Sequence, residues 1–459
     1  MSHAQVLRTA AEIAIRYLDE VGTRHVGGRA NRTDLAAALG GPLPEGQLDP
    51  VSVIRDLSAA ADPGLVATPG PRFFGFVTGG ALPVSVAAEW LTSAYDQNGA
   101  LYVMSPAVAV MEDVVSAWLL DLLHLPAASS VGFVTGAHMA NFTCLAAARH
   151  EVLRRVGWNI EDDGFQAAPR LTVIVGDEVH ISVVGAARML GIGAGELVRV
   201  PVDGQGRMRL DAFEEKLAGT SGPVIICTQA GNVNTGGSDP VGAIAAAAHR
   251  RQAWVHVDGA FGLWAAAVPG LQEQVAGLAD ADSWTTDAHK WLNVPYDSGL
   301  AIVAHPAPHR AAMSLHASYL MRGAEEERIG MDWVPESSRR ARVIPIYALL
   351  RTLGRSGVQA MIVRNCAFAQ RIADHLRGVP GVRVLNEVVL NQVLLSFGSD
   401  AVTRDVIARV QADGTCWVGG ATWRGQQVMR ISISNWSTTE DDVDRSAAAI
   451  RRAFTDASG

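Results

Sequence analysis

Residues 284–299 read Trp-Thr-Thr-Asp-Ala-His-Lys-Trp-Leu-Asn-Val-Pro-Tyr-Asp-Ser-Gly, and an apolar strand candidate follows over residues 299–304. Lys290 lies in this stretch between His289 and Trp291, with few other charges nearby. Burial removes hydration from an amine and favours its neutral form. We therefore expect Lys290 to be a nucleophile that attacks a carbonyl carbon, rather than a surface lysine.

A carboxylate in a second stretch extends this pattern. Residues 254–261 read Trp-Val-His-Val-Asp-Gly-Ala-Phe, and Asp258 directly follows a strand that looks buried. On its own, Asp258 could equally cap a helix that begins at Gly259. Next to a pyridine nitrogen, its charge would keep that nitrogen protonated and make the ring an electron sink. An amine nucleophile and a strand-end carboxylate are together what a pyridoxal phosphate site requires.

Short apolar runs alternate with helical patterns in the middle of the chain. Apolar strands separated by helices indicate an α/β fold with a mainly parallel sheet covered on both faces. Ligands on such sheets bind at the carboxyl ends of the strands, where Asp258 is expected to lie. The expected strands are 171–175, 197–200, 224–227, 253–257 and 300–304, and the expected helices between them are 141–156, 181–190, 211–217 and 241–250.

We expect three parts along the chain. Residues 1–62 form an N-terminal helical segment, 63–314 the large domain, and 315–459 a smaller α+β C-terminal domain. Residues 315–332 are polar and rich in Gly, Glu and Arg, so we expect a mobile loop there. Outside the sheet region, helices are expected over 3–20, 50–61, 83–95, 106–123, 341–353 and 358–376, and an alternating section over 382–397, 405–413 and 428–434.

Composition argues against several classes of function. The chain has 459 residues, a formal charge of −8 and no basic run, so we expect a globular protein without a nucleic-acid partner. Its four cysteines are far apart and lack metal-ligand spacing, so we expect no structural metal and a reducing, cytoplasmic location. There is no signal-peptide pattern and no apolar run of membrane-spanning length, so we expect a soluble protein without a membrane partner.

A small-residue turn that opens a helix is the candidate phosphate site. Residues 132–149 read Gly-Phe-Val-Thr-Gly-Ala-His-Met-Ala-Asn-Phe-Thr-Cys-Leu-Ala-Ala-Ala-Arg. Such a turn directs free backbone N–H groups and the positive end of the helix dipole at one spot, which suits an anion. Junctions of this kind are common, so the turn alone is a weak indication.

Three other features have both a structural and a functional interpretation. His180 follows a strand, and it is either a capping or core histidine or an imidazole stacked on a flat cofactor ring. The turn-rich aromatic segment 69–80 is either a loop whose phenylalanines fill a core or a pocket wall. Glu112 and Asp113 fall inside an expected helix, where charges usually lie on the solvated face.

These pieces occur in one order along the chain, together with further motifs: Phe73-Phe74, Ser105-Pro106-Ala with Glu112, Thr135-Gly136-Ala137, Asp-Glu-Val-His180, Val-Asp258-Gly-Ala260-Phe, Asp-Ala-His289-Lys290-Trp, Glu336-Ser-Ser-Arg-Arg-Ala-Arg and the run 429–443. The set resembles the group II pyridoxal-phosphate-dependent amino acid decarboxylases, which include aromatic-amino-acid, glutamate and diaminobutyrate decarboxylases. The resemblance runs from about residue 65 to the C-terminus. It implies the aspartate-aminotransferase fold (fold type I), a homodimer with active sites at the subunit interface, and a place in amino acid metabolism.

The resemblance also implies a role for each matched residue. Lys290 would form the internal aldimine with pyridoxal phosphate, and Asp258 would pair with the pyridinium nitrogen. His180 would stack on the ring and orient the substrate carboxylate, so these three are the candidate catalytic residues. The other implied contacts are Thr135, Gly136, Ala137 and His138 at the phosphate with Asp287 and His289 nearby, Ala260 under the ring, Asn232 near its 3-hydroxyl, and Phe73, Phe76, Val77, Ala100 and Tyr102 along the substrate pocket.

The sequence departs from the family pattern at two places. His138 replaces the serine that is common in the phosphate turn. Family decarboxylases usually carry a tyrosine on the mobile loop, where it returns a proton to the substrate carbon, but residues 321–332 contain none. Either Tyr319 or His316 takes that role, or the product is an aldehyde formed by oxidative decarboxylation-deamination.

Three functions therefore stay open. The first is decarboxylation of an L-amino acid to the amine and carbon dioxide, with a mild preference for an aromatic or bulky side chain. The second is another pyridoxal phosphate reaction on the same fold, namely aldehyde synthesis, carbon–carbon cleavage or aminotransfer. The third is a non-catalytic dimeric scaffold.

Overall fold

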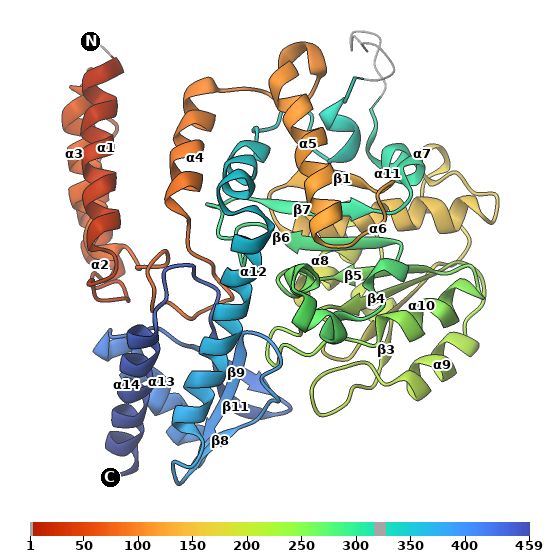
Figure 1. Cartoon of the computed structure of the whole chain (residues 1–459). Coiled ribbons are helices and arrows are strands. Elements are labelled where there is room, and N and C mark those ends of the chain that lie inside the picture. The colour runs from red at the N-terminus through yellow and green to blue at the C-terminus, as the bar shows by residue number, and fades with distance from the viewer. Residues whose placement is uncertain (1–2, 316–326) are drawn as a thin grey trace.

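The structure is a computed structural model that describes residues 3–315 and 327–459. Within these residues the strands form two sheets, a seven-stranded sheet between residues 130 and 303 and a four-stranded sheet between residues 382 and 432 (Figure 1). The expected fold class, with a mainly parallel large sheet followed by a smaller α+β part, is confirmed.

The large sheet has the strand order β1-β7-β6-β5-β4-β2-β3. Strands β2 to β6 pair in parallel, while β7 is antiparallel to both β1 and β6. The carboxyl ends of the parallel strands therefore meet at one edge of the sheet. The strands are β1 (Ser130–Val134), β2 (Thr172–Gly176), β3 (Leu197–Val200), β4 (Val224–Gln229), β5 (Trp254–Asp258), β6 (Ser283–Asp287) and β7 (Gly299–Val303).

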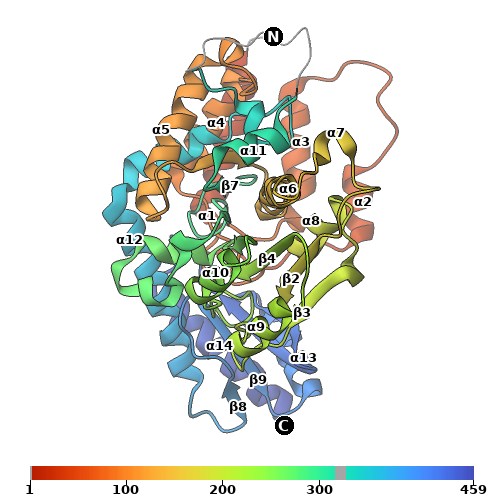
Figure 2. The same cartoon turned by 90° about the vertical axis from the view of Figure 1, so that its right-hand side faces the viewer.

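Helices cover both faces of this sheet and bury most of its residues. One face packs on α5, α9, α10 and the first half of α12, and the other packs on α6, α8 and α11. Figure 2 shows α6 in end-on view beside the strands. The helices of this part are α4 (Pro83–Tyr95), α5 (Pro106–Leu122), α6 (Ala137–Arg154), α7 (Ile160–Asp163), α8 (Ile181–Met189), α9 (Leu210–Ala218), α10 (Val241–His249) and α11 (Pro306–Met313).

The alternation of side chains along β5 supplies both faces of the sheet. Val255 and Val257 join the core beneath α10 and α12. Trp254, His256 and Asp258 occupy the intervening positions, so they point to the opposite face, which α6 covers. One five-residue strand therefore delivers a hydrophobic layer to one side and three hydrogen-bonding side chains to the other.

Strand β6 is absent from the expected strands, because its sequence, Ser-Trp-Thr-Thr-Asp, contains no apolar run. Its polar side chains are nevertheless buried. Asp287 and Ser283 find hydrogen-bond partners on α6 and β5, and Trp284 fills the core on the other face. Tertiary partners outweigh the low apolar content here.

The C-terminal part packs helices against one face of an antiparallel sheet with the order β10-β11-β9-β8. The two helices expected over 341–353 and 358–376 are one element, α12, with a backbone break at Gly354, whose φ is 58°. Figure 1 shows α12 running from the large sheet to the small one. The elements are α12 (Val343–Leu376), β8 (Val382–Val384), β9 (Gln392–Phe397), α13 (Asp400–Asp413), β10 (Gly419–Trp423), β11 (Gln426–Ser432) and α14 (Glu440–Ser458).

The N-terminal helices stand to one side of the rest (Figure 1). They are α1 (His3–Glu20), α2 (Arg32–Leu39), which the sequence does not predict, and α3 (Pro50–Ala61). Thr9 is the buried residue of α1 and Val51 that of α3, and several of their large apolar side chains stay exposed in the single chain.

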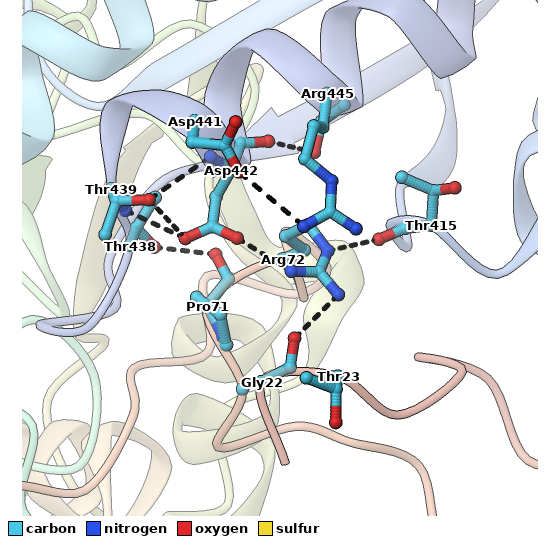
Figure 3. Close-up of polar contacts among 12 residues, drawn as sticks. Gly22, Thr23, Pro71, Arg72, Thr415, Thr438, Thr439, Asp441, Asp442 and Arg445 are labelled. Carbon is cyan, nitrogen blue, oxygen red and sulfur yellow. Dashed lines mark hydrogen bonds and ion pairs between the residues drawn. The ribbon is translucent and has the colours of Figure 1, made fainter. Parts of the chain in front are cut away.

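Arg72 ties three distant parts of the chain together (Figure 3). Its guanidinium donates to the Asp442 carboxylate at 2.7 Å, to the Thr415 carbonyl at 2.6 Å and to the Gly22 carbonyl at 2.9 Å. Thr438 adds a hydroxyl hydrogen bond to the Pro71 carbonyl at 2.7 Å. This cluster fixes the start of the aromatic segment 69–80 against the N-terminus of α14.

Glu112 corrects one expectation. It lies on α5 but is buried, not solvated, because its carboxylate pairs with the guanidiniums of Arg328 and Arg339. Residues 316–326 of the expected mobile loop lie outside the described residues. The loop does not extend through residue 332 as expected, because Arg328 is ion-paired and the 3-10 helix Gly330–Trp333 buries Met331.

The domain boundaries expected after residues 62 and 314 stay predictions. Helix α12 packs on α4 and α5 of the large part and on α14 of the C-terminal part, so it contacts both. None of the helices in the described part of the chain is long and apolar enough to cross a membrane.

Candidate active site

Lys290 and Asp287 form an ion pair at the carboxyl end of β6. The Lys290 Nζ lies 3.0 Å from Oδ2 of Asp287, and both side chains are largely buried. The other oxygen, Oδ1, accepts a hydrogen bond of 2.6 Å from the backbone N–H of Ala137, the first residue of α6. One carboxylate therefore accepts the first N–H of α6 and neutralises the lysine, and the following N–H groups of that helix end stay available.

The expectation that Lys290 is held as a neutral amine is wrong for this arrangement. Burial is the largest single influence on the pKa of Lys290 and acts to lower it. The Asp287 carboxylate opposes burial through its charge and its hydrogen bond, with smaller contributions from Asp258 and Tyr296. Together they raise the pKa of Lys290 above its ordinary value.

Asp258 ends β5 and is held by hydrogen bonds from two sides. Its Oδ2 accepts from the Asn141 amide of α6 at 3.2 Å, with the Ser182 hydroxyl at 3.4 Å. Its Oδ1 accepts from the backbone N–H of Ala260 at 3.2 Å. A carboxylate accepts about four hydrogen bonds, so Asp258 keeps capacity for a ring N–H.

His180 joins this cluster as the N-cap of α8. Its Nδ1 accepts the backbone N–H of Ser182 at 3.2 Å, so the neutral ring carries its proton on Nε2. The pKa of His180 is lowered, mainly by burial and also by the positive charges of Lys290 and Arg430, while Asp258 opposes them. The capping interpretation is correct, and the same residue also lies in the electrostatic neighbourhood of Lys290 and Asp258.

The turn before α6 packs tightly against the lysine segment. A Cβ atom on Gly136 would lie 3.1 Å from the His289 ring, and one on Gly299 would lie 2.4 Å from the Gly136 Cα. His289 Nδ1 accepts the Ser298 N–H at 3.1 Å, and burial lowers the pKa of His289. The side chain of His138 instead lies against Gly185 of α8. A Cβ atom added to Gly185 would lie only 2.8 Å from Nε2 of His138.

Two other predicted contacts lie at the same edge of the sheet. Ala260 links the Asp258 carboxylate to the backbone of Asp287, since its N–H donates to Asp258 Oδ1 and its carbonyl accepts the backbone N–H of Asp287 at 2.9 Å. The side-chain oxygen of Asn232, Oδ1, accepts the Asn234 backbone N–H at 2.9 Å. Its side-chain nitrogen, Nδ2, is buried without a partner in the described residues. The cofactor roles of Ala260, Asn232, Thr135, Gly136, Ala137 and His138 stay predictions.

The aromatic segment reaches the lysine through its backbone. A Cβ atom on Gly79 would lie 1.8 Å from the Lys290 carbonyl oxygen, so only glycine fits there. Phe73 is buried and stacks on Trp417 at 5.0 Å, and the exposed Phe76 packs on the same ring at 5.2 Å. Val77 is a buried β-branched residue at a φ of 58°, a strained conformation that proteins often keep at functional sites.

Ala100 is buried and accepts the Met331 N–H through its carbonyl at 3.1 Å, and Tyr102 begins a short 3-10 helix beside it. Within the described residues of the single chain, neither side chain forms a hydrogen bond or ring contact with Lys290. The pocket role of Phe73, Phe76, Val77, Ala100 and Tyr102 stays a prediction.

Two residues of the site were not among those predicted. Arg430, in β11, is half-buried, and among the described residues its guanidinium has no hydrogen-bond or ion-pair partner. Burial lowers the pKa of Arg430, and its charge reaches His180. The sequence signal is a basic residue inside the apolar run 428–433.

Tyr296 is the second such residue. Its ring packs on His289 at a centroid distance of 4.2 Å, and it contributes to the electrostatic environment of Lys290. Tyr319 and His316, the proton donors considered from the sequence, lie outside the described residues. Tyr296 is a hydroxyl-bearing side chain close to the lysine that sequence reasoning passed over.

The side chains present fit pyridoxal phosphate. An amine for the aldehyde carbon, an anchored carboxylate for the ring nitrogen and a helix N-terminus for an anion lie at one sheet edge. The buried amide nitrogen of Asn232 is a donor that still lacks an acceptor. Fold and site together define the class of protein: a pyridoxal phosphate enzyme of the aspartate-aminotransferase type.

Comparison with known proteins agrees. Residues 38–397 match the pyridoxal-dependent decarboxylase conserved domain. The chain is 25% identical to tryptophan decarboxylase 1 of Oryza sativa subsp. japonica over 88% of this chain and 84% of that protein. It is 26% identical to the aromatic-L-amino-acid decarboxylase of Cavia porcellus (87% and 86%) and 25% identical to the 4-hydroxyphenylacetaldehyde synthase of Rhodiola rosea (85% and 82%).

Among solved structures, Oryza sativa TDC with PLP and tryptamine superposes with a TM-score of 0.91 at 24% identity, covering 98% of this chain and 97% of that one. Rhodiola rosea 4-hydroxyphenylacetaldehyde synthase superposes with a TM-score of 0.87 at 22% identity, covering 99% of both chains. The chain belongs to the pyridoxal-phosphate-dependent decarboxylase family, and pyridoxal phosphate is its cofactor.

Proposed function

We propose that the protein decarboxylates an L-amino acid to the corresponding amine and carbon dioxide. The observation that carries this proposal is the half-buried guanidinium of Arg430, which has no partner among residues 3–315 and 327–459 and whose charge reaches His180. A fixed cation without a counter-ion inside a site is suited to a ligand carboxylate. When bound, pyridoxal phosphate draws electrons from a bond at the substrate α-carbon through its protonated ring nitrogen.

The chain's residues divide the work. Lys290 would hold the cofactor through its ε-amine, which must first lose its proton to bond to the aldehyde carbon. Arg430, with the Nε2–H of His180, would bind and orient the α-carboxylate so that this group is the one to leave. Asp258 would accept the N–H of the ring nitrogen and favour its protonated form.

Tyr296 is our candidate for returning a proton to the substrate α-carbon, which completes the amine. Its phenolic oxygen can donate a proton, and its ring is fixed on His289 beside Lys290. A tyrosine here supplies the group that the sequence lacks at residues 321–332.

Aldehyde synthesis is the second candidate, because relatives of nearly equal identity are named aldehyde synthases and residues 321–332 contain no tyrosine. That reaction consumes one dioxygen and one water for each amino acid. It releases one aldehyde, carbon dioxide, ammonia and hydrogen peroxide, so its products differ from those of simple decarboxylation.

The experiment is a product balance. Enzyme loaded with pyridoxal phosphate is incubated with a panel of aromatic, aliphatic, acidic and basic L-amino acids. Carbon dioxide, amine, ammonia and peroxide are then measured in the same samples. We expect carbon dioxide and amine in equal amounts with no ammonia or peroxide; equal amounts of carbon dioxide, ammonia and peroxide would refute the proposal in favour of aldehyde synthesis.

We also propose that the protein is a homodimer and works in the cytoplasm. The dimer is supported by exposed apolar side chains on α1 and α3, including Leu7 at 64%, Ile15 at 52% and Leu57 at 55% exposure. Four free cysteines, three of them buried, suit a reducing compartment. Light scattering after gel filtration should give twice the chain mass of 48.5 kDa, and a monomer mass at micromolar concentration would refute the dimer.

A further inference from the structure

A chain of hydrogen bonds runs through the core and ends on Asp258. Trp254 Nε1 donates to Ser283 Oγ at 2.9 Å, and Ser283 Oγ lies 2.9 Å from His256 Nδ1. His256 Nε2 lies 2.8 Å from Asn141 Oδ1, and Asn141 Nδ2 donates to Asp258 Oδ2 at 3.2 Å.

Strand periodicity and strand pairing put these groups together. Trp254, His256 and Asp258 are alternate residues of β5, so they share the face covered by α6, which carries Asn141. Ser283 is the direct partner of His256 in the β5–β6 ladder. This series of hydrogen bonds is therefore formed by residues of the sheet and of α6, and none of its members lies in a loop.

The direction of every hydrogen bond follows from the two ends. An indole N–H can only donate and a carboxylate can only accept. At the carboxylate end, Asn141 must turn its N–H groups toward Asp258 and its oxygen toward His256, so His256 donates from Nε2. A neutral His256 then accepts at Nδ1, so Ser283 donates to it while accepting from Trp254. The Asn141 amide is left with its N–H groups facing Asp258.

This arrangement requires a neutral His256. Burial lowers the pKa of His256 to about 4, so the ring is neutral at physiological pH. Trp254, Ser283, His256 and Asn141 each have no measurable exposure, so water does not compete for these bonds.

The His256 N–H also fixes the orientation of the Asn141 amide. An amide has nearly the same shape when its oxygen and nitrogen exchange places. In the exchanged orientation the Asn141 oxygen would face the Asp258 carboxylate, and its nitrogen would face the His256 N–H. Both contacts would be repulsive, so the two end groups exclude that orientation.

We propose that Asn141 and His256 are positioning residues for the cofactor, which hold the Asp258 carboxylate in the orientation that accepts the N–H of the ring nitrogen. The carboxylate accepts from the Asn141 amide and the Ser182 hydroxyl at Oδ2 and from the Ala260 N–H at Oδ1, so it keeps a lone pair that could accept a ring N–H. This role rests on cofactor binding and holds for either product, amine or aldehyde. A failure of the product balance above therefore leaves it standing.

The test uses two amide variants of the same histidine. His256→Gln places a side-chain N–H near the position of Nε2 and can still donate to Asn141. His256→Asn places its amide near Nδ1, so it keeps the Ser283 contact and loses the donor to Asn141. If His256 had only a structural role, the stabilities of the two variants would follow the side-chain volume that each loses. His256→Asn would then be less stable than His256→Gln and would not differ from it at the cofactor.

The readouts are the ¹⁵N NMR shift of pyridoxal phosphate labelled at the ring nitrogen and the dissociation constant of the cofactor. We expect His256→Gln to keep the protonated-ring shift of the wild type and His256→Asn to move toward the neutral-ring shift. We also expect His256→Asn to bind the cofactor about ten- to a hundredfold more weakly, the range for losing one charge-assisted hydrogen bond. The same ring-nitrogen shift in both variants, changed or unchanged, would overturn the proposal.

Asn141→Leu provides a second route if the His256 variants do not fold. It removes the donor to Asp258 directly, and its matched control is His309→Leu. His309 is likewise buried between two hydrogen-bond partners, Ser130 and the Trp333 carbonyl, but has no link to Asp258. Weaker cofactor binding in Asn141→Leu than in His309→Leu supports the proposal, and equal binding in the two folded variants overturns it.

Discussion

Replacing Asp287 by asparagine should reverse the pKa shift of Lys290. In the wild type the Asp287 charge and hydrogen bond outweigh burial, so the pKa of Lys290 lies above its ordinary value of 10.5. Asp287→Asn keeps an oxygen that can accept the Ala137 N–H and removes the charge. Burial then becomes the largest remaining influence, and the pKa of Lys290 should fall below its ordinary value.

The energies behind this prediction follow from the ion-pair distance. Two unit charges 3.0 Å apart attract by about 5 kcal/mol at an effective dielectric constant of about 20. Removing a buried ammonium from water costs several kcal/mol, so the pair is only moderately favourable. Breaking such a pair on one side destabilises a protein by about 3–5 kcal/mol.

The loss should depend on pH, with a definite sign. A lysine whose folded pKa is raised stabilises the fold below its unfolded pKa, and that stabilisation disappears as the pH rises through the folded value. In Asp287→Asn the folded pKa is lowered, so the variant gains stability as the pH rises. The gap between wild type and variant should therefore be largest near neutral pH and narrow as the pH approaches 10.5.

The assays use cofactor-free protein. With an unfolding entropy of about 2.1 cal/mol/K per residue, a loss of 3–5 kcal/mol lowers the melting temperature of a chain of this length by about 3–5 °C. The pKa itself can be read by NMR of ¹⁵N-labelled lysine, because the sequence contains only two lysines, Lys216 and Lys290. Lys216 lies exposed on α9 and serves as the internal reference.

A matched control separates titration from general damage. Asp442→Asn also removes one partner of a buried ion pair, but the remaining partner is Arg72, and arginine side chains do not lose their proton in proteins. The loss of stability in Asp442→Asn should therefore be the same near neutral pH and near pH 10.5. An unchanged Lys290 titration in Asp287→Asn, or a stability gap that does not narrow at high pH, would refute the reasoning.

Three other changes test the site. Arg430→Met should raise the substrate KM and lower kcat/KM by about a hundredfold, the range for losing a charged hydrogen-bond partner. Cofactor binding, measured by fluorescence, should stay unchanged, and a large loss of cofactor affinity would contradict the assignment of Arg430 to the substrate carboxylate. Tyr296→Phe should leave the KM within about threefold and cut amine formation by about a hundredfold, as for a lost general acid, and an unchanged product balance would exclude it as the proton donor. Gly79→Ala places a methyl group against the Lys290 carbonyl, so it should destabilise the fold by about 1–3 kcal/mol and weaken cofactor binding. Gly46→Ala is the control and should have neither effect, because no atom lies within 4 Å of the position of its added methyl group.

The sequence predicts the large sheet well where apolar runs mark its strands. Strand β5 is an example, because Val255 and Val257 show a buried face directly, and Asp258 shows where the strand ends. The same reasoning fails for β6, whose hydroxyl and carboxylate groups become buried only because α6 and β5 bring partners to them. Propensity and periodicity report local preference, while these partners come from distant parts of the chain.

Charge networks are the other limit of sequence reasoning. Glu112 was expected on a solvated face, yet the segment that brings Arg328 and Arg339 returns more than 200 residues later and buries it. Lys290 was expected to be neutral from its apolar neighbours, but Asp287, three residues before it, faces the same side. In both cases the residue types were visible, and the side-chain directions depended on tertiary structure.

The central claim is that Lys290 carries pyridoxal phosphate. The direct measurement is borohydride reduction of the cofactor-loaded protein, followed by digestion and mass spectrometry. We expect one reduced pyridoxyl group per chain on the peptide that contains Lys290, and its loss in Lys290→Arg. A label on Lys216, or a cofactor that stays bound without any reducible bond to lysine, would contradict it.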